Sequence, residues 1–328
     1  MSAAGRGNAP AGEDQPVLVI GGPTASGKSA LAVALAALLG GEVINADSMQ
    51  VYRGLPILTA QPDAATQARV PHRLYGLLEL DERCSAGRWR TMAVAAITAA
   101  RARGKVPIVV GGTGLYLRAL MTGLAEIPDT PPELRARLAA RLEAIGAPAF
   151  HGELAARDPE MAARLQPTDR QRLIRAAEVI EATGRSLAQW QRETKPTLAG
   201  EAALRFHRVL VAPPREALYA ACDGRFQAMI ERGALAEAQA MAQRGLDPAL
   251  PSMKALGLPA LIGHLRGEMA LEGAIHQAQS ATRHYAKRQM TWFNRQFIAD
   301  SLINEQLSDI NLHRFILLII KFHLTKSF

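Results

Sequence analysis

Eight consecutive residues near the N-terminus form a pattern typical of phosphate binding. The residues are Gly22, Pro23, Thr24, Ala25, Ser26, Gly27, Lys28 and Ser29. Glycines allow a tight turn whose N–H groups point at phosphate oxygens, Lys28 adds a cation, and the Ser29 hydroxyl can bind Mg²⁺. An apolar run at residues 17–20 precedes the pattern and an Ala/Leu-rich run follows it. This strand, loop and helix context favours a diphosphate or triphosphate site over a Gly-rich turn without a ligand.

Carboxylate and hydroxyl side chains follow two later strand-like runs. Asp47 follows the run at residues 42–46 and would lie beside the phosphate loop, where a carboxylate can accept a proton or hold Mg²⁺ through water. The alternative for Asp47 is a cap on the next helix. Thr113 lies in the Gly-rich turn at residues 111–114 and belongs either to a ligand site or to a tight turn without a ligand. The strand-like run at 106–110 continues into this turn and not into a Walker B carboxylate, which counts against a motor or switch ATPase.

Two segments concentrate basic residues. The first contains Asp169, Arg170, Gln171, Arg172, Leu173, Ile174 and Arg175. Arg172 and Arg175 share a helix face, where they could clamp anionic oxygens or form a solvated basic face. The second segment places its basic side chains in one arc of a helix, and these are Arg283, His284, Lys287, Arg288 and Arg295. This basic arc could contact a phosphate backbone, while we expect the aromatic side of the same helix to pack in the core.

The composition favours a globular protein with an anionic partner. The chain has 328 residues, of which 48% are hydrophobic, and a formal net charge of +8. This length allows an α/β core with a smaller unit, and the positive charge makes nucleic acid the first candidate partner. Cys84 and Cys222 are far apart and lack metal-binding spacing, so neither a disulfide framework nor a zinc site is indicated. A reducing cytoplasm fits this cysteine usage, and we expect a monomer.

Strand-like runs alternate with helical patterns along most of the chain. The runs lie at residues 17–20, 42–46, 106–110 and 206–211. This rhythm predicts an α/β fold with a parallel sheet covered by helices on both faces and ligands beyond the carboxyl ends of the strands. An Arg/Ala/Leu-rich helical stretch interrupts the rhythm after residue 128, and we interpret it as an inserted helical domain.

We therefore divide the chain into a core and an insertion. The boundaries are 16–128 for the first part of the core, 129–196 for the insertion, and 197–300 for the second part of the core with the basic C-terminal helix. Residues 1–15 are predicted to be a disordered leader, since they lack the apolar segment of a signal peptide. Residues 301–328 form a tail to which we assign no role. Its apolar run at 315–320 is too short to span a bilayer, so we expect it to pack on the core and expect no membrane association.

The ordered set of motifs resembles the bacterial tRNA dimethylallyltransferase family. Besides the phosphate loop, the matching segments are residues 47–54, 111–116, 171–175 and 285–293. The family transfers a dimethylallyl group from its diphosphate to N6 of adenine 37, next to the anticodon. The resemblance implies a P-loop NTPase-like core with an inserted tRNA-binding domain, Mg²⁺ as cofactor, and dimethylallyl diphosphate and the tRNA anticodon loop as partners.

The resemblance also implies roles for individual residues. Residues 22–29 would hold the diphosphate, with Lys28 acting on the leaving group and Ser29 binding Mg²⁺. Asp47 would be the general base for N6, and Thr113 would help to position the adenosine. The implied tRNA contacts are Asp47, Ser48, Met49, Gln50, Thr113, Arg135, Gln171, Arg172, Leu173, Ile174 and Arg175, with Arg283, Lys287 and Arg288 from the basic arc.

Two places depart from the family pattern. Gln61 stands where the family usually has a lysine. Leu258 and Pro259 stand where it usually has a tyrosine followed by a basic residue. We therefore assign no phosphate or RNA contact to either place.

Three other functions would use part of the same residues. A small-molecule kinase would share the phosphate loop and Asp47, but the insertion, the basic arc and the Gly-rich turn would then have no role. An adenylate isopentenyltransferase would use the same catalytic set on free nucleotides, and only the RNA-contacting surfaces distinguish it. A non-catalytic RNA-binding module would leave Lys28, Ser29 and Asp47 without a role.

Overall fold

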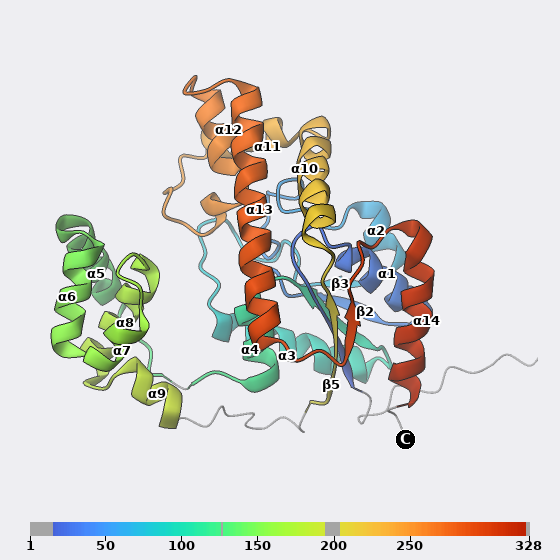
Figure 1. Cartoon of the computed structure of the whole chain (residues 1–328), viewed down its shortest axis with the longest axis horizontal. Helices are drawn as coiled ribbons and strands as arrows, with labels where there is room; N and C mark the ends of the chain where they lie inside the picture. The colour runs from blue at the N-terminus through green and yellow to red at the C-terminus, as the bar shows by residue number, and fades with distance from the viewer. Residues whose placement is uncertain (1–15, 126, 194–203, 326–328) are drawn as a thin grey trace, which may run out of the picture. The chain divides into compact units, whose positions relative to one another are not determined.

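A computed structural model describes residues 16–125, 127–193 and 204–325 of the chain (Figure 1). The chain divides into two compact units. The core unit comprises Met1–Met121 and Ala203–Phe328, and the helical unit comprises Thr122–Ala202, where the sequence predicts an insertion at 129–196. The expected leader at residues 1–15 lies outside the described residues.

A six-stranded sheet, parallel throughout, forms the centre of the core unit, in the order β3-β2-β4-β1-β5-β6. Its strands are β1 (Val17–Gly21), β2 (Glu42–Asn45), β3 (His72–Arg73), β4 (Pro107–Gly111), β5 (Phe206–Val211) and β6 (Ser301–Ile303). The predicted parallel sheet is confirmed, and β1, β2, β4 and β5 lie within one residue of the expected runs. The edge strands β3 and β6 were not predicted, because two or three residues are too few to show a periodic pattern.

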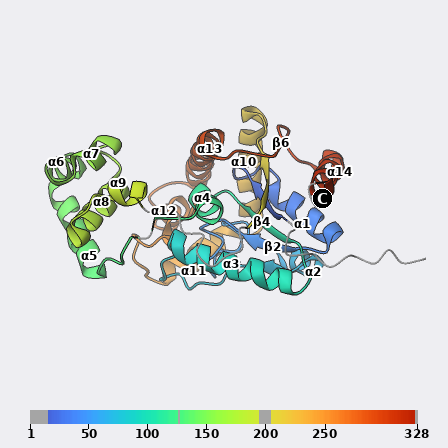
Figure 2. The same cartoon turned by 90° about the horizontal axis from the view of Figure 1, so that it is seen from below.

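Helices cover both faces of this sheet (Figures 1 and 2). Those of the core unit are α1 (Lys28–Leu39), α2 (Ala64–Arg69), α3 (Ala86–Ala102), α4 (Gly114–Thr122), α10 (Arg215–Glu231), α11 (Ala234–Gln243), α12 (Leu258–Leu265), α13 (Leu271–Gln296) and α14 (Asp309–Thr325), with a 3₁₀ turn at Ser252–Lys254. Every residue of β1, β2 and β4 is buried, as expected for strands between two helical layers.

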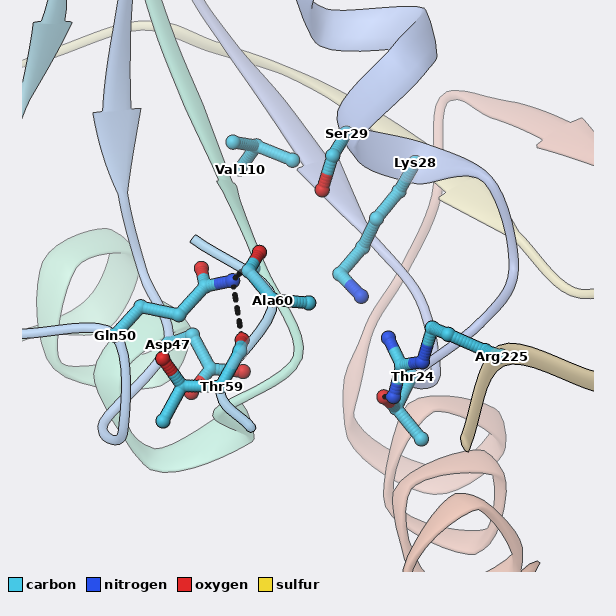
Figure 3. A pocket seen from close by; sticks show the side chains of 10 residues that line it. Thr24, Lys28, Ser29, Asp47, Gln50, Thr59, Ala60, Val110 and Arg225 are labelled. Carbon is cyan, nitrogen blue, oxygen red and sulfur yellow. Dashed lines mark hydrogen bonds between the residues drawn. The ribbon is translucent and has the colours of Figure 1, made fainter. Parts of the chain in front are cut away.

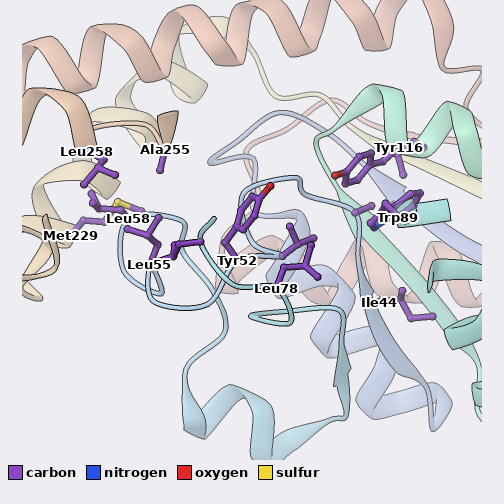
Figure 4. Packing of buried hydrophobic residues seen from close by; sticks show 14 of the residues in the cluster. Ile44, Tyr52, Leu55, Leu58, Leu78, Trp89, Tyr116, Met229, Ala255 and Leu258 are labelled. Atoms are coloured by element: carbon purple, nitrogen blue, oxygen red, sulfur yellow. The ribbon is translucent and has the colours of Figure 1, made fainter. Parts of the chain in front are cut away.

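Alternation along each strand divides the core into two clusters. Leu18 and Ile20 of β1 pack with α1 and α14 on one face. Val17 and Val19 pack on the other face with Trp89 of α3. Figure 4 shows part of this second cluster, which also holds the loop after β2. The loop that carries the residues after β2 is therefore anchored by burial of its own apolar side chains.

The described part of the tail, to which we assign no role, belongs to the core unit. Residues 301–303 form β6, which pairs with β5 at the edge of the sheet. Ile316 and Ile319 of α14 are buried in the same cluster as α1, so the predicted packing of the run at 315–320 is confirmed. None of the helices in the described part of the chain has the length and apolar character to cross a bilayer.

The helical unit forms its own core. Its helices are α5 (Pro132–Ile145), α6 (Ala147–Arg157), α7 (Pro159–Arg164), α8 (Arg170–Thr183) and α9 (Leu187–Glu193). Leu142, Phe150, Leu154 and Leu173 are among its buried side chains. Asp158 accepts a hydrogen bond from Met161 N at 3.0 Å, which caps α7 where Pro159 begins a new helix.

Candidate active site

The phosphate loop joins β1 to α1 and depends on two glycines. A Cβ atom on Gly22 would lie 2.5 Å from the Val211 carbonyl oxygen, so only glycine fits between these strands. Gly27 has a φ of 87°, in the left-handed region that glycine adopts at low cost, and it caps the N-terminus of α1. Lys28 and Ser29 then start the helix, where its first N–H groups and its dipole favour an anion.

The Lys28 ammonium lies in a desolvated position at this loop. Its Nζ donates to the Pro23 carbonyl oxygen at 3.0 Å. Desolvation above all, together with the neighbouring Arg225, lowers the pKa of Lys28 to about 8, while Asp47 acts in the opposite direction. An anion bound here would therefore gain from neutralising two cations that repel each other.

Asp47 is held in a tight turn after β2. Its backbone N donates to Asn45 Oδ1 at 2.8 Å, and its own Oδ1 accepts from Met49 N at 2.8 Å. The Trp89 indole donates to the Asn45 carbonyl oxygen at 2.9 Å and fixes the end of the strand. The alternative interpretation of Asp47 as a helix cap is wrong, because residues 48–51 form turns and the next helix, α2, is capped by Asp63.

Thr113 connects this turn to the end of β4. Its Oγ1 accepts from Ser48 N at 2.9 Å, and its hydroxyl donates to Ser48 Oγ at 3.3 Å. A Cβ atom on Gly111 would lie 2.1 Å from the Ala46 carbonyl oxygen, so the two strand ends touch at this point. Thr113 thus positions the residues beside Asp47. The adenosine contact that the resemblance implies for Thr113 stays a prediction.

A pocket brings five of the predicted residues together, namely Thr24, Lys28, Ser29, Asp47 and Gln50 (Figure 3). It is lined by Thr24, Lys28, Ser29, Asp47, Gln50, Thr59, Ala60, Val110, Gly111 and Arg225. In Figure 3, Asp47 and Gln50 lie on one side, and Lys28 and Arg225 lie on the other. A carboxylate therefore faces two cations across a small space, as needed to hold an anion on one side and accept a proton on the other.

Arg225 of α10 lines this pocket, although no sequence pattern indicated it. Its guanidinium donates to the Thr24 hydroxyl of the phosphate loop. Desolvation lowers its pKa from the usual arginine value, which the charges of Cys222 and Asp47 partly oppose. Arg225 thus adds a second cation to the phosphate side of the pocket. An isolated arginine in a helix lacks a recognisable spacing, so only the fold shows this role.

Gln289 of α13 belongs to the matching segment at 285–293, but the sequence assigned it no role. Its Oε1 accepts from Thr24 N at 2.8 Å, and its Nε2 donates to the Gly112 carbonyl oxygen at 2.9 Å. One buried side chain therefore joins the phosphate loop to the turn that contains Thr113. A Cβ atom on Gly114 would lie 2.2 Å from the Trp292 ring, so α13 packs directly on this turn. Residues of the motif at 285–293 thus hold the phosphate loop and the turn with Thr113 in place.

The loop after β2 closes the other side of the pocket. Gln50 Nε2 donates to the carbonyl oxygens of Thr59 and Ala60 at 2.9 and 2.8 Å. Gln61, where the family usually has lysine, turns its Nε2 to the Tyr52 carbonyl oxygen at 2.8 Å. Gln61 therefore stabilises the loop internally. The Glu237 carboxylate of α11 accepts hydrogen bonds from the backbone N–H groups of residues 57 and 58 in the same loop, at 2.8 and 2.7 Å.

The residues predicted to contact tRNA differ in exposure. Lys287 and Arg288 are exposed on α13. Arg283 forms an ion pair with Asp223 at 2.5 Å and is only 23% exposed, so it is less accessible than the basic arc implies. Met49 packs partly against the core beneath the Asp47 turn.

Within the helical unit, two of the predicted contacts share one buried carboxylate. Arg135 pairs with Glu178 at 3.0 Å and Arg175 lies 3.6 Å from the same group. Arg172 pairs with Asp169 at 3.3 Å and stays largely exposed. The Leu173 side chain is fully buried in the core of the unit, and the tRNA contact that the resemblance implies for Leu173 stays a prediction.

Fold and site together define an enzyme of the P-loop α/β class, with a carboxylate facing the phosphate loop. A family model described as IPP transferase matches residues 50–296, and one described as isopentenyl transferase matches residues 15–83. A tRNA dimethylallyltransferase of Rhodospirillum centenum is 58% identical over 285 residues, which cover 87% of this chain and 90% of that protein. The chain therefore belongs to the tRNA dimethylallyltransferase family.

Solved structures agree with this assignment. The tRNA isopentenylpyrophosphate transferase of Bacillus halodurans is 31% identical with a TM-score of 0.67, covering 96% of this chain and 98% of that one. A eukaryotic dimethylallyltransferase acting on tRNA is 29% identical with a TM-score of 0.78, covering 94% of this chain and 79% of that one. The predicted fold class and the resemblance stated above are thereby confirmed.

Proposed function

We propose that this enzyme transfers the dimethylallyl group of dimethylallyl diphosphate to N6 of adenine 37 in tRNA and releases diphosphate. The observation that carries the proposal is the pocket in which Asp47 faces Lys28 and Arg225 at a phosphate loop, in a chain of this family. The phosphate loop then binds a leaving group, and no phosphoryl group is transferred. We also place the enzyme in the cytoplasm as a monomer.

The reaction divides naturally between the two sides of the pocket. As the bond between the allylic carbon and the diphosphate oxygen breaks, negative charge grows on the diphosphate, where Lys28, Arg225 and the N–H groups of the loop stabilise it. The N6 electron pair forms the new bond to the same carbon. The proton that N6 loses passes to Asp47 on the opposite side. Adenine 37 must leave its stack to enter the pocket.

Mg²⁺ fits the oxygen donors of this pocket. Ser29, the residue predicted to bind Mg²⁺, lines it with its hydroxyl oxygen. The described residues contain no group of three or more His, Cys, Asp or Glu that could hold a metal, so diphosphate oxygens and water would supply the remaining ligands, as Mg²⁺ commonly requires. When bound, Mg²⁺ would neutralise charge on the leaving diphosphate.

One transfer assay tests the proposal. The protein is incubated with labelled dimethylallyl diphosphate, Mg²⁺ and either tRNA, AMP or ATP, and the label is followed into each acceptor. We expect labelling of tRNA alone. Labelling of AMP or ATP would favour an adenylate isopentenyltransferase, and rapid ATP hydrolysis would favour a kinase.

The pKa of Lys28 predicts a pH dependence of diphosphate binding. Below a pH of about 8 the ammonium is charged before binding, and affinity is at its maximum. Above this pH the free enzyme must take up a proton to bind the anion, so affinity falls with rising pH by up to about tenfold per unit. Calorimetry with inorganic diphosphate measures this. Lys28→Arg serves as the control. The arginine side chain stays charged above a pH of about 8, so the diphosphate affinity of this variant should not fall with rising pH.

The basic arc predicts salt-dependent tRNA binding. Replacing Lys287 and Arg288 with glutamine should weaken tRNA binding and reduce the slope of log affinity against log salt by roughly one for each phosphate that is no longer neutralised. Turnover at saturating tRNA should persist. The control replaces the exposed Arg232 and Arg244, which carry the same charge outside α13. Equal slopes for both double variants would show that the basic arc is only a solvated face.

A further inference from the structure

The segment after β6 touches the phosphate loop. Gln306 Nε2 donates to the Ala25 carbonyl oxygen at 2.9 Å, across 281 positions of sequence. Leu307 is buried beside the loop, and a Cβ atom on Gly27 would lie 2.6 Å from the Leu307 Cβ. Gln306 and Leu307, which are neighbours in the segment after β6, therefore contact Ala25 and Gly27 of the phosphate loop.

Gln306 contacts the loop at its most strained point. Ala25 has a φ of 63°, in the left-handed region that costs free energy for any residue with a Cβ. The trans peptide is planar, so fixing the Ala25 carbonyl also fixes the direction of the next N–H, that of Ser26. A hydrogen bond to this carbonyl thus stabilises the loop in one conformation.

The rest of the chain holds Gln306 in place. Asn311 of α14 donates from Nδ2 to the Gln306 backbone carbonyl at 3.0 Å. Arg314 of the same helix pairs with Glu305 at 2.6 Å. Before β6, Asp300 accepts from Arg208 N at 2.8 Å and pairs with the guanidinium at 3.0 Å. Both ends of the segment are therefore anchored independently of the loop.

Gln306 also lines a cavity on the phosphate side. This cavity has a volume of about 330 Å³ and includes Lys28, Ser29 and Arg225 in its wall. Gln306 Oε1 is buried and has no hydrogen-bond partner among the described residues. Turning the amide over would place two acceptors against each other at Ala25, so the contact with the loop determines the orientation of the side chain.

We propose that Gln306 is a positioning residue of the diphosphate site, which it serves by holding the Ala25 carbonyl and with it the binding conformation of the phosphate loop. The proposal rests on the proposed function and extends it to the C-terminal segment. Gln306 acts through the loop and does not itself touch the reacting atoms. Its replacement should therefore weaken diphosphate binding without changing tRNA binding.

The experiment compares Gln306→Ala and Gln306→Met with Asn304→Ala, an exposed neighbour on the same segment. Methionine keeps the length and packing of the side chain but removes the donor. Calorimetry with inorganic diphosphate at fixed Mg²⁺ is combined with KM values for dimethylallyl diphosphate and tRNA, and with thermal midpoints. For both Gln306 variants we expect diphosphate affinity to fall by roughly 3- to 10-fold, as for removal of one hydrogen bond, with the KM for tRNA unchanged.

Wild-type diphosphate affinity in Gln306→Met would overturn the proposal. So would an equal reduction of diphosphate and tRNA affinity with a lower thermal midpoint, because this would indicate a general role in folding. The binding measurement needs no acceptor. If the wild type failed to modify tRNA while Gln306→Met still bound diphosphate more weakly, the proposed function would fail and the role of Gln306 would stand.

Discussion

Replacing Asp47 with asparagine should lower turnover by about 10²- to 10⁴-fold, while the KM for tRNA changes by no more than a few-fold. A general base acts mainly in the transition state, so its removal affects the rate more than the binding of either substrate. Asparagine removes the proton acceptor but keeps the turn, because its side-chain oxygen can still accept the hydrogen bond from Met49 N. Single-turnover labelling of tRNA with both substrates saturating measures the effect.

The matched control for this variant is Asp63→Asn. Asp63 also accepts a backbone N–H, that of Thr66 at 2.8 Å, but it caps α2 and does not line the pocket. We expect normal turnover from it. If Asp47→Asn also retained normal turnover, Asp47 would not be the base, and N6 would have to lose its proton to another acceptor.

The parts of the fold that follow from local sequence were predictable. The phosphate loop is a continuous segment whose glycines and Lys28 define its function, and the inner strands are continuous apolar runs because helices cover both sides. Asp47 was located correctly because parallel strands bring their carboxyl ends to one edge. Local sequence could not show that the residues after Asp47 form turns. These turns exclude the interpretation of Asp47 as a helix cap.

The parts that depend on distant contacts were not predictable. Arg225 reaches Thr24 from 201 positions away and has no spacing that marks it as functional. Gln289 reaches Thr24 from 265 positions away, and the motif at 285–293 that contains it does not show which of its residues contacts the loop. The strand β6 is too short to recognise, so Gln306 could not be placed beside the loop. The burial of Leu173 was not foreseen, because a motif does not separate its exposed residues from the buried ones that position them.

Replacing Arg225 with alanine should reduce the rate of transfer by about 10²- to 10³-fold and weaken diphosphate binding, because it removes a cation from the site where charge develops on the leaving group. Its guanidinium also supports the Thr24 hydroxyl. Arg225→Lys should recover only part of the rate, since an ammonium can replace the charge but not the planar set of donors that contacts the loop and phosphate oxygens together.

A control variant and thermal midpoints distinguish the loss of the Arg225 charge from a general loss of stability. Arg232→Ala removes an exposed arginine at the end of the same helix and should leave transfer unchanged. Rates of a single turnover are compared at saturating dimethylallyl diphosphate, with thermal midpoints as a check on folding. The Arg225 cation repels Lys28 in the absence of substrate, so Arg225→Ala should raise the pKa of Lys28 and move the fall in diphosphate affinity to a pH above about 8. A rate within about threefold of wild type would show that Lys28 and the loop N–H groups suffice for the leaving group.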